Sequence, residues 1–312
     1  MTLEEAMERY GIPLPGDKGE YDKNTYREFD DIYLGCFYET FSSEMTGESE
    51  KQNFKKVAVV LGGQIGAGKN SLVAHTKREF HKKGRSLVLI AADDYRKFYP
   101  NREEILATCP EFYAKITGTA INNVTLRILK FASDNGYGFI FDATMKNIRV
   151  VNTMKTWDSD YEIQVKVLAV SRLRSLVSAT IRNAEFRRLA NDCRYVSVET
   201  HDETYYGIPE TLKYLEQLRI ASSIKLYVRG VDPISPIEKY SSRQTPEISS
   251  ADELIRLREL DEKEYLENYA KKDLEYLENL TQDLSQVEKA EIQRITDILK
   301  EAIHNQQQGT SR

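Results

Sequence analysis

Short apolar runs alternate with longer amphipathic segments through the middle of the chain. Residues 57–61, Val-Ala-Val-Val-Leu, form an unbroken apolar run that is typical of a strand buried on both faces of a parallel sheet. Similar runs predict strands at 86–92, 137–141, 163–170 and 224–228, and helical patterns occur at 119–133, 172–189 and 201–220. This alternation predicts an α/β fold in which helices cover both faces of a doubly wound parallel sheet.

The two ends of the chain have a different pattern. Residues 1–52 are polar, with helical spacing in places, and one apolar patch at 32–38 with Phe41 is expected to dock on the core. Proline and serine at 231–236 and 241–250 predict a linker or surface loop. Leucines at helical spacing over 251–303 predict one or two solvated helices, with a coiled-coil contact to another chain as the alternative. We therefore expect an N-terminal helical segment (1–52), a core (53–232), and a linker with a C-terminal helical region (233–312).

Composition and charge narrow the class of protein. The chain is 40% hydrophobic and 30% charged with a formal net charge of −5, which argues against nucleic acid as the main partner. Cys36, Cys109 and Cys193 are far apart and outside any CxxC spacing, which favours a reducing compartment. The first five residues include two glutamates where a signal peptide needs positive charge, and no apolar run approaches a membrane span. We expect a cytoplasmic protein with no membrane contact.

A glycine-rich loop follows the first apolar run and precedes a predicted helix. Its residues fit the P-loop pattern, in which backbone N–H groups and the helix N-terminus hold phosphates and the lysine contacts the β- and γ-phosphates. The pattern therefore predicts that a P-loop kinase-like sheet binds the phosphates of a nucleoside triphosphate. The expected cofactor-binding residues are Gly63, Gln64, Ile65, Gly66, Ala67, Gly68, Lys69, Asn70 and Ser71.

Asn70 departs from this pattern, because serine or threonine normally ligates Mg²⁺ at that position. Ser71 is about 100° further around the helix and is a poor substitute. Three interpretations remain: weakened metal binding, a metal held mainly by water and carboxylates, or an inactive variant. The second is favoured, with Asn70 and Asp142 as the candidate Mg²⁺ ligands.

Acidic residues follow two other predicted strands. Asp93 and Asp94 end the second strand and Asp142 ends the third, so all three should lie at the carboxyl edge of the sheet where ligands bind. A carboxylate there can accept the proton of an attacking hydroxyl, although an Asp before a helical turn is also a common N-cap. Further on, arginines suited to neutralising phosphate, or to forming a solvated basic face, occur at Arg182, Arg187, Arg188 and Arg194.

Taken in order, these motifs resemble the zeta toxins of bacterial toxin–antitoxin systems, P-loop kinases that use ATP to phosphorylate UDP-N-acetylglucosamine. The resemblance covers about 57–230 and a stretch near 240–249. It rests on the glycine loop, Asp93 with Tyr95-Arg96 and Pro100, Asp142-x-Thr144, Arg182 with Glu185, and Arg194 before His201-Asp202.

By resemblance, each of these residues takes a role. Asp93 is implied as general base and Lys69 as the phosphate lysine, with Arg182 and Arg194 stabilising charge on the transferring phosphate. Asp142, Thr144 and Lys146 are implied to bind the substrate. The implied partners are a UDP-sugar substrate and a small helical antitoxin of the epsilon type, which covers the nucleotide site.

Several departures leave the sugar open. Asp142 stands where the family has Glu, Lys146 replaces an Arg, and Leu126 occupies the position of a sugar-contacting Glu. Two alternatives to the toxin kinase therefore remain. One is a P-loop kinase of a nucleoside, antibiotic or other small hydroxyl compound, and the other is a catalytically weak nucleotide-binding module, suggested by Asn70.

Overall fold

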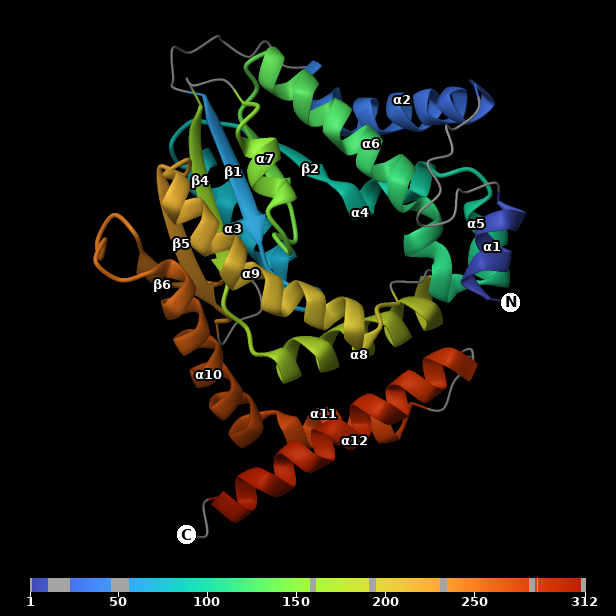
Figure 1. Cartoon of the computed structure of the whole chain (residues 1–312), viewed down its shortest axis with the longest axis vertical. Helices are drawn as coiled ribbons and strands as arrows, with labels where there is room; N and C mark the ends of the chain where they lie inside the picture. Colours follow the sequence, from blue (N-terminus) through green and yellow to red (C-terminus); the bar gives the residue numbers. More distant parts are fainter. Residues whose placement is uncertain are drawn as a thin grey trace.

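A six-stranded sheet forms the centre of the described part of the chain, in the order β2-β3-β1-β4-β5-β6 (Figure 1). The computed structural model describes residues 2–10, 23–45, 56–157, 161–190, 195–230, 235–280, 284 and 286–309. The first five strands are parallel, which confirms the predicted doubly wound sheet. The strands are β1 (Val57–Gly62), β2 (Val88–Ala91), β3 (Phe139–Asp142), β4 (Glu162–Leu168), β5 (Ser223–Val228) and β6 (Ile237–Ser241).

Helices cover both faces of the sheet, and alternation along β1 determines which residues face which layer. Val57, Val59 and Leu61 pack against α3, whereas Ala58 and Val60 belong to the larger core on the opposite face. The main helices are α2 (Lys23–Met45), α3 (Lys69–His81), α6 (Tyr113–Asp134), α8 (Arg172–Ala190), α9 (Val198–Leu218), α10 (Ser250–Asn268), α11 (Ala270–Glu278) and α12 (Gln286–Gly309). Shorter ones are α1 (Leu3–Arg9), α4 (Ala92–Tyr95), α5 (Arg102–Thr108) and α7 (Arg149–Met154), with 3₁₀ turns Arg96–Phe98 and Pro110–Phe112.

A strand lies between the two stretches expected to be linker or surface loop, and shares only Ser241 with them. β6 pairs antiparallel with β5 at the edge of the sheet, where Glu238 accepts hydrogen bonds from Lys225 and Tyr227. An edge strand buries little, and here Tyr240 and Ser241 are the buried residues, so the apolar run that signals a central strand is absent. Residues 231–234 lie outside the described ranges.

The long helix α2 is built into the main core through its inward face. Ile32, Cys36 and Phe41 are buried in the same cluster as β1 and α6, which confirms the predicted docking of this patch. Leu34 and Tyr38, from the same patch, are on the exposed face. Helical spacing explains the division, because these two residues project to one side of the helix one turn apart.

The described residues of the C-terminal region form three helices where one or two were predicted. In Figure 1, α11 and α12 lie side by side below α8, and together with α8 they enclose a separate apolar cluster that includes Leu173, Val177, Leu277 and Ile295. Glu288 of α12 accepts a hydrogen bond from Asn183 of α8 at 3.0 Å. The described helices pack on the domain as an integral layer, and none of them has the length and hydropathy to cross a membrane.

Candidate active site

The glycine loop joins β1 to the N-terminus of α3, as the sequence predicted. Gly66 and Gly68 have φ angles of 80° and 97°, a left-handed conformation that residues with a Cβ rarely adopt. A Cβ on Gly66 would also lie 1.9 Å from the carbonyl oxygen of Ser175, so α8 packs directly against the loop. Ala67 N donates to the carbonyl of Gln64 at 3.1 Å, closing the turn. The loop is therefore held by its own sequence and by α8.

Lys69 and Asp142 face each other at the carboxyl edge of the sheet. The Nζ of Lys69 lies 3.8 Å from Oδ1 of Asp142, and the two side chains are 15% and 19% exposed. Strand register explains the meeting, because Asp142 of β3 is aligned with Leu61 of β1, just before the loop. Burial raises the pKa of Asp142, with Asp93 and Asp94 adding to the rise and Lys69 opposing it. Lys69 thus faces a buried carboxylate on which two further carboxylates also act.

The position of Asp142 fits a magnesium ligand. Its buried Oδ1 has no hydrogen-bond donor among the described residues, and an oxygen of that kind suits Mg²⁺, which takes one or two carboxylates together with phosphates and water. Asn70 directly follows Lys69 in the first turn of α3, and its side chain is exposed. The backbone N–H of Ser71 donates a hydrogen bond to the carbonyl oxygen of Gly68. The described residues hold no cluster of three or more His, Cys, Asp or Glu suited to a metal.

Asp93 and Asp94 stand on the short helix α4, directly after β2. The carboxylate of Asp93 is exposed and pairs with Nε of Arg96 at 3.2 Å, and Arg96 is anchored in turn on the carbonyl of Ala114 at 3.1 Å. Asp94 lines a cavity of about 620 Å³ between α2, α3 and β2. Of the two, Asp93 raises the pKa of Asp142 more.

The arginines that the sequence offers for neutralising phosphate lie in different environments. Arg182 on α8 is partly buried and its charge acts on Asp142, lowering that carboxyl's pKa. Arg187 instead faces Glu288 of α12, with 3.7 Å between Nε and Oε1. The side chain of Arg188, and all of 191–194 with Arg194 and Cys193, lie outside the described residues.

The residues expected to bind the substrate follow β3. Thr144 accepts a backbone hydrogen bond from Gly63 N at 3.5 Å, which ties this segment to the glycine loop. Lys146 is exposed and pairs with Glu203 of α9 at 3.2 Å. A Cβ on Gly207 would lie 1.9 Å from the carbonyl oxygen of Lys146, so α9 closely packs against this segment. The substrate candidates therefore lie between the loop and α9.

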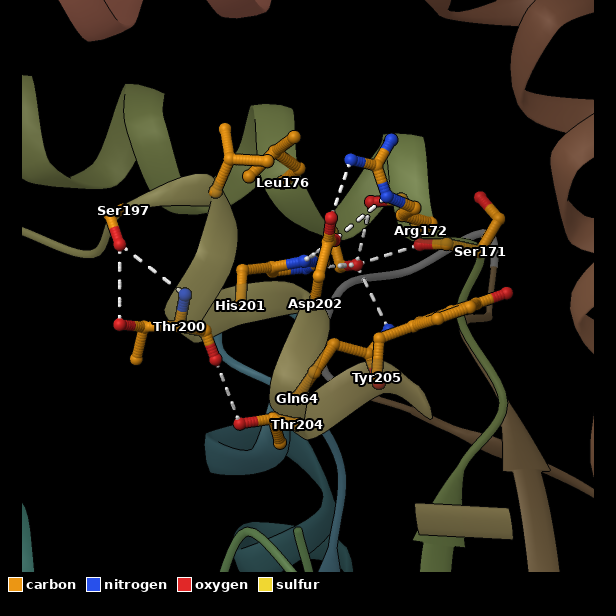
Figure 2. A network of polar contacts seen from close by, with 12 residues as sticks. Gln64, Ser171, Arg172, Leu176, Ser197, Thr200, His201, Asp202, Thr204 and Tyr205 are labelled. Atoms are coloured by element: carbon orange, nitrogen blue, oxygen red, sulfur yellow. Dashed lines mark hydrogen bonds and ion pairs between the residues drawn. The ribbon is translucent and has the colours of Figure 1, made fainter. Parts of the chain in front are cut away.

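A buried polar network that the sequence did not predict supports the loop from α8, α9 and α10 (Figure 2). The side chain of Gln64 is fully buried and donates to the carbonyl of Val170 at 2.8 Å and to Oγ of Ser175 at 2.9 Å. Arg258 of α10 donates to Oε1 of Gln64 at 3.1 Å. Because this side chain is engaged on all sides, the backbone of Gln64 is what remains for a phosphate.

His201 extends this network towards Arg172. Its Nε2 lies 2.9 Å from Oγ of Ser175 and its Nδ1 lies 3.2 Å from Asp202, which forms a bidentate pair with Arg172 at 2.7 Å (Figure 2). A serine, histidine and aspartate in this order resemble a hydrolytic triad, but His201 and Ser175 have no exposed surface. The group therefore connects helices and has no access to a substrate.

Acidification is expected to destabilise the fold through His201. Burial lowers the pKa of this histidine from its ordinary value of 6.5. As the pH falls, the histidine is therefore protonated in the unfolded chain before it is protonated in the folded protein. Stability should be greatest above about pH 6.5 and decrease as the pH falls. Thermal midpoints at neutral and acidic pH measure the drop, which should be smaller in His201→Gln. It should not vanish, because burial also lowers the pKa of His75. An undiminished drop would remove His201 as the cause.

Arg229 is a second residue at the loop that sequence reasoning missed. It directly follows β5, and its Nε donates to the carbonyl oxygen of Ala67 at 3.1 Å. The signal was present in the sequence, because an arginine placed immediately after an apolar parallel strand must lie at the edge of the sheet where the loop lies.

Comparisons with known proteins identify the same family that the sequence motifs resemble. The model of the zeta toxin family matches residues 42–240. Toxin zeta of Enterococcus hirae is 27% identical over 231 residues, covering 70% of this chain and 77% of its own length. Toxin PezT of Streptococcus pneumoniae is 25% identical over 187 residues, covering 58% and 71%. A solved structure from the PezAT chromosomal toxin–antitoxin system of S. pneumoniae aligns with a TM-score of 0.60 and 22% identity over 91% of this chain and 98% of that one, which supports the fold.

Proposed function

The chain belongs to the zeta toxin family, and we propose that it is an ATP-dependent kinase that acts as the toxin of a toxin–antitoxin pair in the bacterial cytoplasm. The proposed substrate is UDP-N-acetylglucosamine or a related UDP-activated amino sugar. The observation that carries the proposal is the placement of Lys69 and Asp142, 3.8 Å apart, beside a glycine loop at the start of a 13-residue helix. That arrangement is suited to a triphosphate whose terminal group is transferred.

The chain's own residues account for each part of the transfer. Loop N–H groups and the N-terminus of α3 hold the phosphates, and Lys69 orients the β- and γ-phosphates. Asp93 accepts the proton of the sugar hydroxyl while the hydroxyl oxygen forms a bond to the γ-phosphorus. The bond between the γ-phosphorus and the oxygen that bridges it to the β-phosphate breaks, which releases ADP. Arg182 stabilises charge on the moving phosphoryl group, and Arg194 is proposed to do the same.

Asp142, with Asn70 beside Lys69, would hold Mg²⁺. When bound, that ion neutralises charge on the β- and γ-phosphates. Burial disfavours the ionised form of Asp142, and a bound cation would stabilise that form. Lys69 already acts on Asp142 in the same direction. Thr144 and Lys146, between the loop and α9, are proposed to position the sugar nucleotide.

A small helical antitoxin is the proposed partner. PezT comes from a system described as a toxin–antitoxin pair, and a partner that silences a kinase most directly does so by covering its nucleotide site. Binding of antitoxin and ATP would then be mutually exclusive, with each ligand weakening the apparent affinity of the other.

Replacing Asp93 with Asn tests the proposed function. Turnover should fall about 10²–10⁴-fold with little change in ATP affinity, the usual contribution of a positioned base. Asp94→Asn is the matched control, since it is the neighbouring carboxylate on α4 but lines the cavity beside α2 and α3. Its turnover should change much less.

A growth assay gives the same test in cells. In a bacterium lacking the antitoxin, the wild-type gene should arrest growth, Asp93→Asn should be tolerated, and Asp94→Asn should remain toxic. Harmless expression of a folded wild-type protein would contradict the toxin assignment. Reversed effects of the two variants would assign the base to Asp94.

A further inference from the structure

Arg229 holds the glycine loop from the side of β5 and α8. Its Nε donates to the carbonyl of Ala67 at 3.1 Å, its Nη2 donates to the carbonyl of Gly66, and its Nη1 donates to Oγ of Ser178 on α8 at 3.1 Å. One planar guanidinium thus bridges two successive peptide groups of the loop and the helix that packs against it. A lysine in the same place would offer a single point of contact.

These bonds determine how the loop presents its N–H groups. A trans peptide unit points its C=O and its N–H in opposite directions. Where Arg229 binds the carbonyl of Ala67, the N–H of Gly68 in the same peptide unit must point to the far side of the loop. Gly68 is also the N-cap residue directly before α3, with φ of 97°, so this N–H adds to those of the first helical turn.

The charge of Arg229 lacks a direct counter-ion among the described residues. Its three hydrogen-bond acceptors are two carbonyls and one hydroxyl, all of them neutral. Burial, with a smaller contribution from Arg174, lowers its pKa to about 10, and Asp261 and Asp273 oppose the shift only through space. Arg174, by contrast, pairs directly with Asp261 at 2.7 Å. A largely buried cation without a carboxylate partner is stabilised electrostatically when an anion binds close to it.

We propose that Arg229 is a positioning residue for phosphate binding, which orients the loop peptides and whose charge is compensated by the bound polyphosphate. The ligand class is therefore a chain of phosphates, and the nucleoside and the sugar acceptor are not contacted by this residue. The inference rests on the proposed function, because it concerns the same nucleotide site. It adds a requirement from the residue that follows β5, outside the glycine loop and the arginines of α8.

Binding measurements on Arg229→Met test the proposal. Titration calorimetry with inorganic tripolyphosphate and with ATP should show an affinity loss of about 10- to 100-fold for both, the range expected when charge-assisted hydrogen bonds are lost. The thermal midpoint without ligand should change little, because losing three hydrogen bonds is offset by removing an enclosed charge. The rise in midpoint on adding tripolyphosphate should shrink accordingly. Arg229→Lys, which keeps the charge without the fork, should bind with intermediate affinity.

Arg174→Met is the matched control. It removes an arginine that pairs with a buried carboxylate, so it should lower the thermal midpoint and leave tripolyphosphate affinity within about 2-fold. The proposal is overturned if Arg229→Met binds tripolyphosphate as tightly as wild type, or if Arg229→Met and Arg174→Met lose stability and affinity in the same proportion. If Arg229→Met does not fold, the proposal is also overturned when Arg229→Lys binds tripolyphosphate with the affinity of the wild-type protein. Wild-type protein that binds neither tripolyphosphate nor ATP would instead remove the proposed function.

Discussion

Replacing Lys69 with alanine is expected to lower the rate of phosphoryl transfer by about 10³-fold or more. The ammonium group is the cation nearest to Asp142, 3.8 Å from its Oδ1, in a site with little exposure to solvent that would screen its charge. Losing it removes the fixed positive charge on the β- and γ-phosphates and leaves Asp142 without its counter-ion. A coupled assay for ADP release, with circular dichroism to verify folding, measures the effect.

Lys77→Ala is the matched control for that result. Lys77 lies two turns further along α3, is exposed, and lines the cavity beside α2, away from the loop. Its removal should leave the rate within about 2-fold, as is usual for surface substitutions. Undiminished transfer in folded Lys69→Ala protein would exclude the glycine loop from the mechanism.

Arg182→Ala should cost about 10³–10⁵-fold in turnover while changing ATP affinity far less, because an arginine of this kind acts on charge that develops during transfer. Its position supports this role, since it is partly buried on α8 and its charge reaches Asp142. Separate measurement of kcat and of the Kd for ATP distinguishes this from a general weakening of binding.

Arg187 offers the contrasting substitution on the same helix. It pairs with Glu288 of α12, whose side chain is 1% exposed, so Arg187→Ala should lower the thermal midpoint by removing a cation that faces a buried carboxylate. Its turnover, measured below that midpoint, should stay close to wild type. Equal losses of turnover at both positions would mean a diffuse basic surface in place of one positioned arginine.

The sequence predicted those parts of the fold that depend on local pattern. The apolar run at 57–61 forms the strand β1. In the loop after it, glycines adopt the left-handed backbone conformation that the P-loop pattern requires. Asp142 could be placed beside Lys69 because parallel strands end at one edge of the sheet, and the observed register agrees. Each of these predictions used a period or spacing that the backbone itself imposes.

What the sequence could not predict depends on contacts between distant segments. Arg258 meets Gln64 across 194 positions, and Arg229 meets the loop from 162 positions further along the chain. No spacing rule relates Arg258 to Gln64. For Arg229, its place directly after β5 predicts the correct edge of the sheet but does not identify the carbonyl oxygens that it binds. Strand β6 escaped prediction for a related reason, since its pairing with β5 depends on an edge that becomes available only once the sheet has formed.

The most direct test of the proposed kinase activity is an incubation of the purified protein with ATP, Mg²⁺ and a panel of UDP-sugars, analysed by mass spectrometry. UDP-N-acetylglucosamine or a close relative should gain the mass of one phosphoryl group, with one ADP formed per product and no gain in the Lys69→Ala control. If the wild-type protein binds ATP yet adds phosphate to none of the UDP-sugars, the proposed substrate class is wrong.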